Sequence, residues 1–153
     1  MTSLLKKAWT EVVDPLIRRP KRVQVAALCY RQTKKHGKEV LLITSRGQGR
    51  WIIPKGWPID GLDAAEAALQ EAWEEAGVVG GKIANTPLGS FEYEKRLDSG
   101  GSAICKTKVF PVEVGKLSAD FPEASERERK WVSLQKAADM VEEPQLQEIL
   151  RDF

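Results

Sequence analysis

Apolar residues follow two different spacings along this chain. In residues 1–17 they recur at helical spacing, at Leu4, Leu5, Ala8, Trp9, Val12 and Val13. A proline and then the basic run RRPKR end this pattern. The sequence therefore predicts an N-terminal helix that is followed by a basic linker.

Strand-like runs, rich in β-branched residues, come next. The stretches VQVAALCY and EVLLITS, joined by the polar segment RQTKKHGK, predict a β-hairpin. The stretch WIIP predicts a short strand that ends at its proline, Pro54. A second strand pair is expected from PLGSFEYEKRL and SAICKTKVFPVEV, which are separated by the turn DSGG.

The last part of the chain mixes irregular and periodic segments. ADFPEASERER is polar and irregular, whereas KWVSL predicts a strand that runs into a helix with Ser133 as its N-cap. A final helix is expected over about residues 145–152. Because helices and strands do not alternate regularly, we expect an α+β fold. In this α/β/α sandwich, a mixed and largely antiparallel sheet lies between helices.

The stretch GWPIDGLDAAEAALQEAWEEAGV, residues 56–78, predicts a helix that is rich in acid. Asp63 can cap its N-terminus, with Glu66 as the reciprocal partner. Gly77 suits the left-handed residue that ends a helix. The predicted helix therefore covers residues 64–76.

Three carboxylates lie on one side of this helix. At about 100° per residue, Glu71, Glu74 and Glu75 fall within an arc of about 100°. Small apolar residues occupy the neighbouring arc, namely Ala65, Ala68, Leu69, Ala72 and Ala76. Like charges at this spacing repel by about 0.2–0.5 kcal/mol per pair. Either water absorbs that repulsion on a solvated acidic face, or a hard cation such as magnesium binds there.

Composition narrows the class of protein. The chain has 153 residues and a net charge of +2, which fits one domain without the basic excess of a general nucleic-acid binder. No apolar run approaches the roughly 20 residues that cross a bilayer, and there is no signal-peptide pattern. We therefore expect a cytoplasmic protein that does not bind membranes. Cys29 and Cys105 lie in apolar stretches and are expected to be buried free thiols.

With its lead-in, the acidic stretch resembles the Nudix box. That signature reads glycine, five residues, glutamate, seven residues, and then Arg-Glu-apolar-x-Glu-Glu-x-Gly-apolar. Gly56 begins the match, and QEAWEEAGV ends it in register. Leu62 and Gln70 stand where the pattern has glutamate and arginine. Because both charged residues are replaced, neither charge is left without its partner. Similar stretches elsewhere imply a Nudix domain over residues 21–153, preceded by a helical extension and basic linker over residues 1–20.

The resemblance also implies roles for individual residues. Glu71 and Glu75 would be ligands of Mg²⁺, with Mn²⁺ as the alternative ion, and the backbone carbonyl of Gly56 would be a further ligand. Glu74 would be a ligand or, through a water, the base, and Glu71 could exchange roles with it. The implied reaction is hydrolysis of a phosphoanhydride bond by a metal-activated water.

Within the Nudix family, the stretches ALCYR, EVLLITS, RGQGRWIIP and EAWEEAGV most resemble hydrolases of diphosphoinositol polyphosphates and diadenosine polyphosphates. PKGW replaces the glycine run of the eukaryotic members. The implied substrate is a polyphosphorylated or nucleoside-diphosphate-linked small molecule. The guanidinium group of arginine can form paired hydrogen bonds with phosphate oxygens, and the indole ring of tryptophan can stack on a nucleobase. The candidate ligand-binding residues are Arg22, Arg46, Arg50, Lys55, Trp57, Lys95 and Arg96, with ordinary solvated surface as the alternative for the basic ones.

Other readings stay open. Leu62 and Gln70 are compatible with a non-catalytic or weakly active Nudix-fold sensor of a phosphorylated ligand. The N-terminal helix around Trp9 is compatible with a docking role, and a homodimer is left open.

Overall fold

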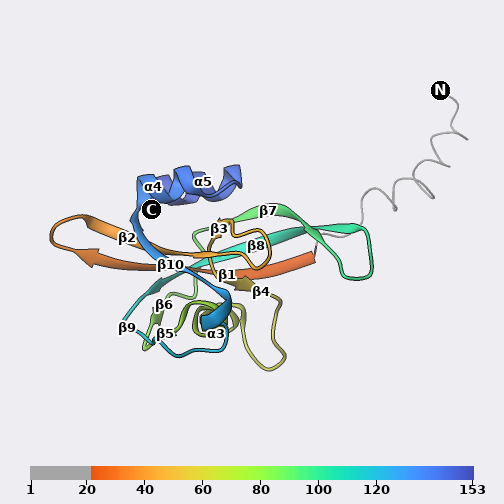
Figure 1. Ribbon diagram of the computed structural model, residues 1–153, viewed down its shortest axis with the longest axis horizontal. Coiled ribbons are helices and arrows are strands. Elements are labelled where there is room, and N and C mark those ends of the chain that lie inside the picture. The colour runs from red at the N-terminus through yellow and green to blue at the C-terminus, as the bar shows by residue number, and fades with distance from the viewer. Residues whose placement is uncertain (1–21) are drawn as a thin grey trace, which may run out of the picture.

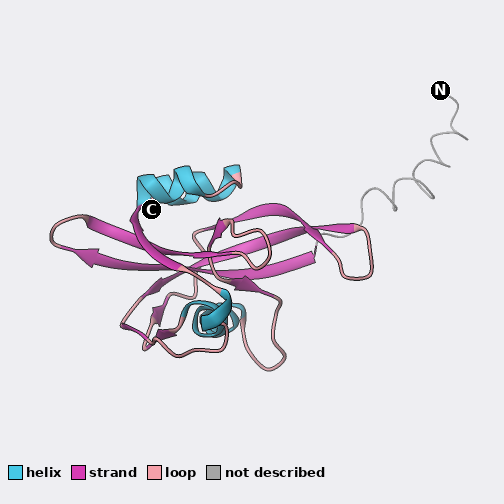
Figure 2. Ribbon diagram, in the orientation of Figure 1, coloured by secondary structure: helices cyan, strands magenta, loops and turns pink. Residues whose placement is uncertain are grey.

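Helices cover both faces of a central sheet in the computed structural model, which describes residues 22–153. α3 (Ala64–Ala76) lies on one face, and α4 (Leu134–Met140) and α5 (Pro144–Asp152) lie on the other (Figure 1, Figure 2). The expected α+β sandwich is thereby confirmed. The expected N-terminal helix and basic linker lie outside the described residues.

Within residues 22–153 the main sheet has eight strands, with the central order β10-β2-β1-β8-β6. β3 and β4 extend it beside β2 and β1, and β7 pairs with β8. These strands are β1 (Arg22–Thr33), β2 (Gly37–Thr44), β3 (Trp51–Ile52), β4 (Lys55–Gly56), β6 (Lys82–Ile83), β7 (Gly89–Arg96), β8 (Ser102–Glu113) and β10 (Arg129–Ser133). A small separate sheet joins β5 (Val78–Val79) to β9 (Lys116–Leu117), and a 3-10 turn, η2, spans Ala124–Glu126.

Both predicted hairpins are confirmed, since β2 pairs antiparallel with β1 and β7 pairs antiparallel with β8. The first turn is tighter than expected, because β1 continues to Thr33 and β2 begins at Gly37. The centre of the sheet is a parallel pairing of β1 with β8, in which Val25 lies opposite Lys108 and Cys29 opposite Val112. This pairing buries the middle of β1 on both faces, as is typical of parallel strands.

The predicted acidic helix is confirmed at both ends. Asp63 accepts a hydrogen bond from the backbone of Glu66, whose side chain accepts one from the backbone of Asp63. Gly77 ends α3 with φ of 72°. The alanines of α3 pack into one core with β1 and β8, whereas α4 and α5 form a second core on the opposite face. Because the buried side chains of α3 are so small, its backbone lies close to the sheet.

The C-terminal end of α3 is tied to a segment much later in the chain. Nη1 of Arg129 donates to the carbonyl oxygens of Ala76 and Ser118, at 2.9 Å each. The backbone nitrogen of Glu123 donates to the carbonyl oxygen of Glu74 at 3.0 Å. These bonds satisfy carbonyls that a helix end leaves open. They also hold the irregular segment around η2 against the acidic face.

Two further expectations concern the cysteines and the membrane. Cys29 and Cys105 are buried and free, as predicted, and burial raises the pKa of the Cys29 thiol to about 12. Among residues 22–153, no helix has the length and apolar character that a bilayer crossing requires.

Candidate functional site

Glu71 and Glu75 of α3 lie directly against strand β4. A Cβ atom placed on Gly56 would overlap the carboxylate of Glu71, so the backbone approaches that carboxylate more closely than any side chain would allow. The backbone nitrogen of Lys55 donates to Oε1 of Glu75 at 3.3 Å. β4 is itself placed by its pairing with β1, in which Gly56 lies opposite Val25. The predicted contact between the glycine lead-in and the acidic helix is therefore present.

The side chains of Glu71 and Glu75 are hydrogen-bond neighbours. Burial, together with that bond and the charge of Glu75, raises the pKa of Glu71 to about 8. Burial also raises the pKa of Glu75, against the opposing effect of the Arg127 guanidinium. Without a cation, this pair therefore resists carrying two full charges.

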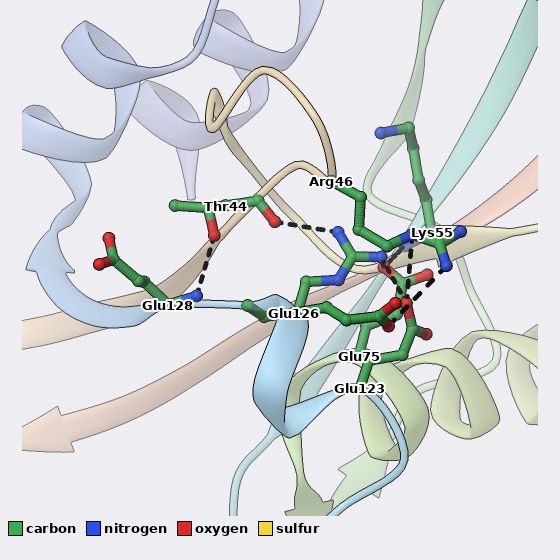
Figure 3. Close-up of polar contacts among 8 residues, drawn as sticks. Thr44, Arg46, Lys55, Glu75, Glu123, Glu126 and Glu128 are labelled. Atoms are coloured by element: carbon green, nitrogen blue, oxygen red, sulfur yellow. Dashed lines mark hydrogen bonds and ion pairs between the residues drawn. The ribbon is translucent and has the colours of Figure 1, made fainter.

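Arg127 supplies a buried positive charge beside this pair. Its Nη2 lies 2.9 Å from Oε1 of Glu123 and 3.5 Å from Oε1 of Glu75, and Nη1 donates to the carbonyl oxygen of Thr44 at 2.9 Å. Figure 3 shows the side chains of Glu75 and Glu123 gathered in one place, while the side chain of Lys55 extends away from them. Arg127 thus joins α3 to the strand that ends at Thr44.

Sequence reasoning missed Glu123 and Arg127. Both lie in the polar segment ADFPEASERER, which carries no periodic pattern. The only signal there is the density of charge, and an exposed linker has the same composition. Their place in the site depends on the contacts that hold this segment to the end of α3.

The oxygen atoms around Glu71 suit a divalent cation. In residues 22–153, no three acidic, histidine or cysteine side chains form a closed cage. Magnesium, however, is normally held by one or two carboxylates together with waters and phosphate oxygens. Glu71 and Glu75 offer two such carboxylates one helical turn apart, and the uncovered backbone of Gly56 lies beside them. A cation there would relieve the repulsion between the two carboxylates.

Glu74 has a different neighbour. Its Oε1 accepts a hydrogen bond from Nε2 of Gln70 at 3.0 Å. Gln70 thus orients Glu74 through a neutral amide at the position where the box has arginine. Leu62, at the position of the absent glutamate, is exposed.

A cavity of about 1290 Å³ runs alongside these residues. It is lined by the three glutamates, Gly56 and six of the seven predicted ligand-binding residues: Arg46, Arg50, Lys55, Trp57, Lys95 and Arg96. Arg22 is the exception and lies outside this lining. It is exposed at the first position of β1, three residues before the level of Gly56, which at about 3.3 Å per residue is roughly 10 Å away.

Two of the six residues already face carboxylates. Nε of Arg46 lies 3.5 Å from Oε1 of Glu123, and Nη1 of Arg50 donates to Oε2 of Glu142 at 3.1 Å. A phosphate bound by either arginine would compete with these ion pairs. The cavity therefore carries both signs of charge in close proximity.

The two lysines of this set contact aromatic rings. Nζ of Lys55 lies 4.9 Å from the ring centre of Tyr93, and Nζ of Lys95 lies 5.8 Å from that of Trp57. Burial lowers the pKa of Lys55 to about 8, although the charges of Glu75 and Glu143 offset part of this effect. Trp57 is one of the few large exposed apolar side chains of the described residues, which leaves its face open to a ligand.

The sandwich fold and the acidic helix agree with comparisons to known proteins. The NUDIX domain family matches residues 20–153, and the chain belongs to this family. The resemblance read from the box is thus confirmed.

The proteins that this chain resembles in sequence include plant and animal proteins. The chain is 37% identical to Nudix hydrolase 21, chloroplastic, of Arabidopsis thaliana over 137 residues, which cover 86% of this chain and 66% of the relative. It is 32% identical to diphosphoinositol polyphosphate phosphohydrolase 3-alpha of Mus musculus over 122 residues, which cover 78% and 68%. The chain spans 53–66% of the length of five Arabidopsis relatives, less than two thirds of each.

A solved structure supports the same fold. The crystal structure of C. elegans Ap4A hydrolase superposes with a TM-score of 0.61, covering 88% of this chain and 96% of that protein. The two sequences are 20% identical, so this likeness concerns the fold.

Proposed function

We propose that this chain is a divalent-cation-dependent pyrophosphohydrolase, with Mg²⁺ as the expected ion and Mn²⁺ as the alternative. Its substrate would be a phosphorylated small molecule of the diphosphoinositol polyphosphate or diadenosine polyphosphate class. The observation that carries this proposal is the pair Glu71–Glu75, two neighbouring carboxyl groups that lie against the backbone of Gly56 beside a large cavity.

In this proposal, the glutamates of α3 have different roles. Glu71 and Glu75 would hold the cation together with the carbonyl of Gly56. A cation at that place would withdraw electrons from phosphate oxygens and make a water more acidic. Glu74, oriented by Gln70, would accept the proton of the attacking water, in line with the leaving phosphate. Arg127 would keep Glu75 and Glu123 in place by charge, without contacting the reacting atoms.

The substrate class has two kinds of support. The names of a mouse relative and of a superposed worm structure refer to diphosphoinositol polyphosphate and Ap4A. In addition, six cationic side chains and Trp57 line the cavity, which suits several phosphates and a stacked ring.

One assay tests the proposal. The protein is incubated with Mg²⁺ and a panel of diphosphoinositol polyphosphates, diadenosine polyphosphates and nucleoside diphosphate sugars, and the products are separated. We expect turnover that is abolished by EDTA and in Glu75→Gln. Tight binding without product on any member would instead favour the sensor, for which Leu62 and Gln70 are the motivating departures from the box.

The remaining expectations stay predictions. Relatives carry the words chloroplastic and mitochondrial in their names, so a cytoplasmic location is not established by similarity. The homodimer is likewise a prediction.

A further inference from the structure

The connection between α4 and α5 places a buried carboxylate in the wall of the cavity. Glu143 lines the cavity, yet only 8% of it is exposed. Among the described residues, its Oε2 has no hydrogen-bond partner. Its Oε1 lies 3.8 Å from Nη1 of Arg50, which is beyond hydrogen-bond distance. A buried acceptor without a donor is costly, and such groups in native proteins call for an explanation.

The backbone holds this carboxylate in place. Pro144 follows Glu143 and restricts it to an extended conformation, with φ of −76° and ψ of 119°. The carbonyl oxygen of Glu143 accepts a hydrogen bond from the nitrogen of Gln147 at 3.0 Å. Leu146 and Leu150 then anchor α5 in the core. These contacts hold the backbone of Glu143 in the wall of the cavity.

The nearest guanidinium is committed elsewhere. Nη1 of Arg50 donates to Glu142 at 3.1 Å, and the backbone of Arg50 is fixed by two hydrogen bonds with Ser45. On the same cavity lining, the hydroxyl of Tyr93 donates to Oε1 of Gln24, so that donor is also occupied. Oε2 of Glu143 thus lacks a donor from residues 22–153, although donors lie nearby.

We propose that Glu143 is a specificity residue, whose Oε2 accepts a hydrogen bond from a neutral hydroxyl or N–H group of the bound substrate. The same negative charge would exclude phosphate groups from this part of the cavity. This inference rests on the proposed function and narrows it. A ribose or a nucleobase offers neutral donors, whereas an inositol ring phosphorylated at every carbon has no free hydroxyl.

The test compares Glu143→Gln with a matched control, Glu148→Gln, which removes the same charge from an exposed side chain of α5 that does not line this cavity. The substrates are diadenosine tetraphosphate and a diphosphoinositol polyphosphate without free hydroxyls. For Glu143→Gln we expect kcat/KM on diadenosine tetraphosphate to fall at least about tenfold, mainly through KM, because a charged hydrogen bond is lost. On the inositol substrate, kcat/KM should stay constant or rise. Equal changes on both substrates, or the same shift of selectivity in Glu148→Gln, would overturn the inference.

Two further measurements separate this inference from the proposed activity. Binding of adenosine to the metal-free protein, followed by ligand-observed NMR, needs no turnover and should weaken in Glu143→Gln but not in Glu148→Gln. Absence of adenosine binding in the unmodified protein would refute the subsite even if the protein hydrolyses its substrates. Glu143→Asp keeps the charge but withdraws the oxygen, so it should lose affinity for adenosine without any gain on the inositol substrate. It also serves as the informative variant if Glu143→Gln does not fold.

Discussion

At the scale of single residues, Glu71 makes the metal-free protein sensitive to pH. Its pKa is about 8 in the folded chain against a usual value of 4.5, so the folded state holds the proton more tightly than the unfolded state. The stabilisation is complete below the unfolded pKa and is lost as the pH rises through about 8. We expect the Tm in EDTA to fall over that interval. Thermal unfolding at several pH values measures this directly.

Glu71→Gln removes this dependence. At pH 8 the variant should melt a few degrees above the unmodified protein in EDTA, since about 1 kcal/mol corresponds to about 2–4 °C at this chain length. Added Mg²⁺ should raise the Tm of the unmodified protein and have less effect on the variant. A Tm that falls in Glu71→Gln at every pH would mean that the carboxyl group has a structural role.

Arg127 and Arg46 contact the same carboxylate in very different environments. The side chain of Arg127 is 5% exposed and that of Arg46 is 62% exposed. Arg127→Ala would leave Glu75 and Glu123 without their buried counter-charge, and we expect a loss of about 3–5 kcal/mol in the free energy of unfolding. Arg46→Ala should cost less than about 1 kcal/mol. Urea titrations of both variants test this contrast, and similar losses would contradict the assignment of Arg127.

At the scale of elements, the sequence predicted the helix whose ends are set by residues close to it in the chain. The bounds of α3 follow from its capping box and from Gly77, all within the helix or next to it. Short strands such as β4 escaped prediction, because two residues carry no period and only the partner strand defines them. The parallel pairing of β1 with β8 escaped for the same reason, since it joins segments about eighty residues apart in the sequence.

The meeting of β4 with α3 gives a variant that separates function from stability. A Cβ in Gly56→Ala would displace the carboxylate of Glu71, which is the end of a flexible side chain, so the fold should lose less than about 1 kcal/mol. The displaced carboxylate should lower kcat/KM for the panel substrates at least about tenfold and weaken Mg²⁺ binding. Isothermal titration with Mg²⁺ and a urea titration give the two readouts.

Gly61 provides the matched control in the same loop. It has φ of 85° and open space around its Cβ position. Gly61→Ala should therefore cost of order 1 kcal/mol through backbone strain and leave Mg²⁺ binding intact. If both variants lose stability and function in parallel, the close approach of Gly56 has no special role.

At the scale of the whole molecule, the candidate site is assembled from distant segments. The acidic helix could be read from one motif, and six of the seven predicted ligand-binding residues do line the cavity. The same reasoning did not find Arg127, Glu123 and Glu143, because their place in the site depends on residues that are distant in the sequence. Arg22 does not line the cavity, because it lies three residues along β1 from the level of Gly56.

The buried thiols of Cys29 in β1 and Cys105 in β8 can be used to measure how readily the central sheet opens. Cys105 lies opposite Arg22, the exposed first residue of β1, whereas Cys29 lies inside β1, whose pairing with β2 continues from Tyr30 to Thr33. Strand ends open more readily than the core, so a thiol-labelling reagent should modify Cys105 faster than Cys29. In the Cys105→Ala variant, labelling of Cys29 should then follow global unfolding, and its rate in increasing urea would give the free energy of unfolding without any optical probe.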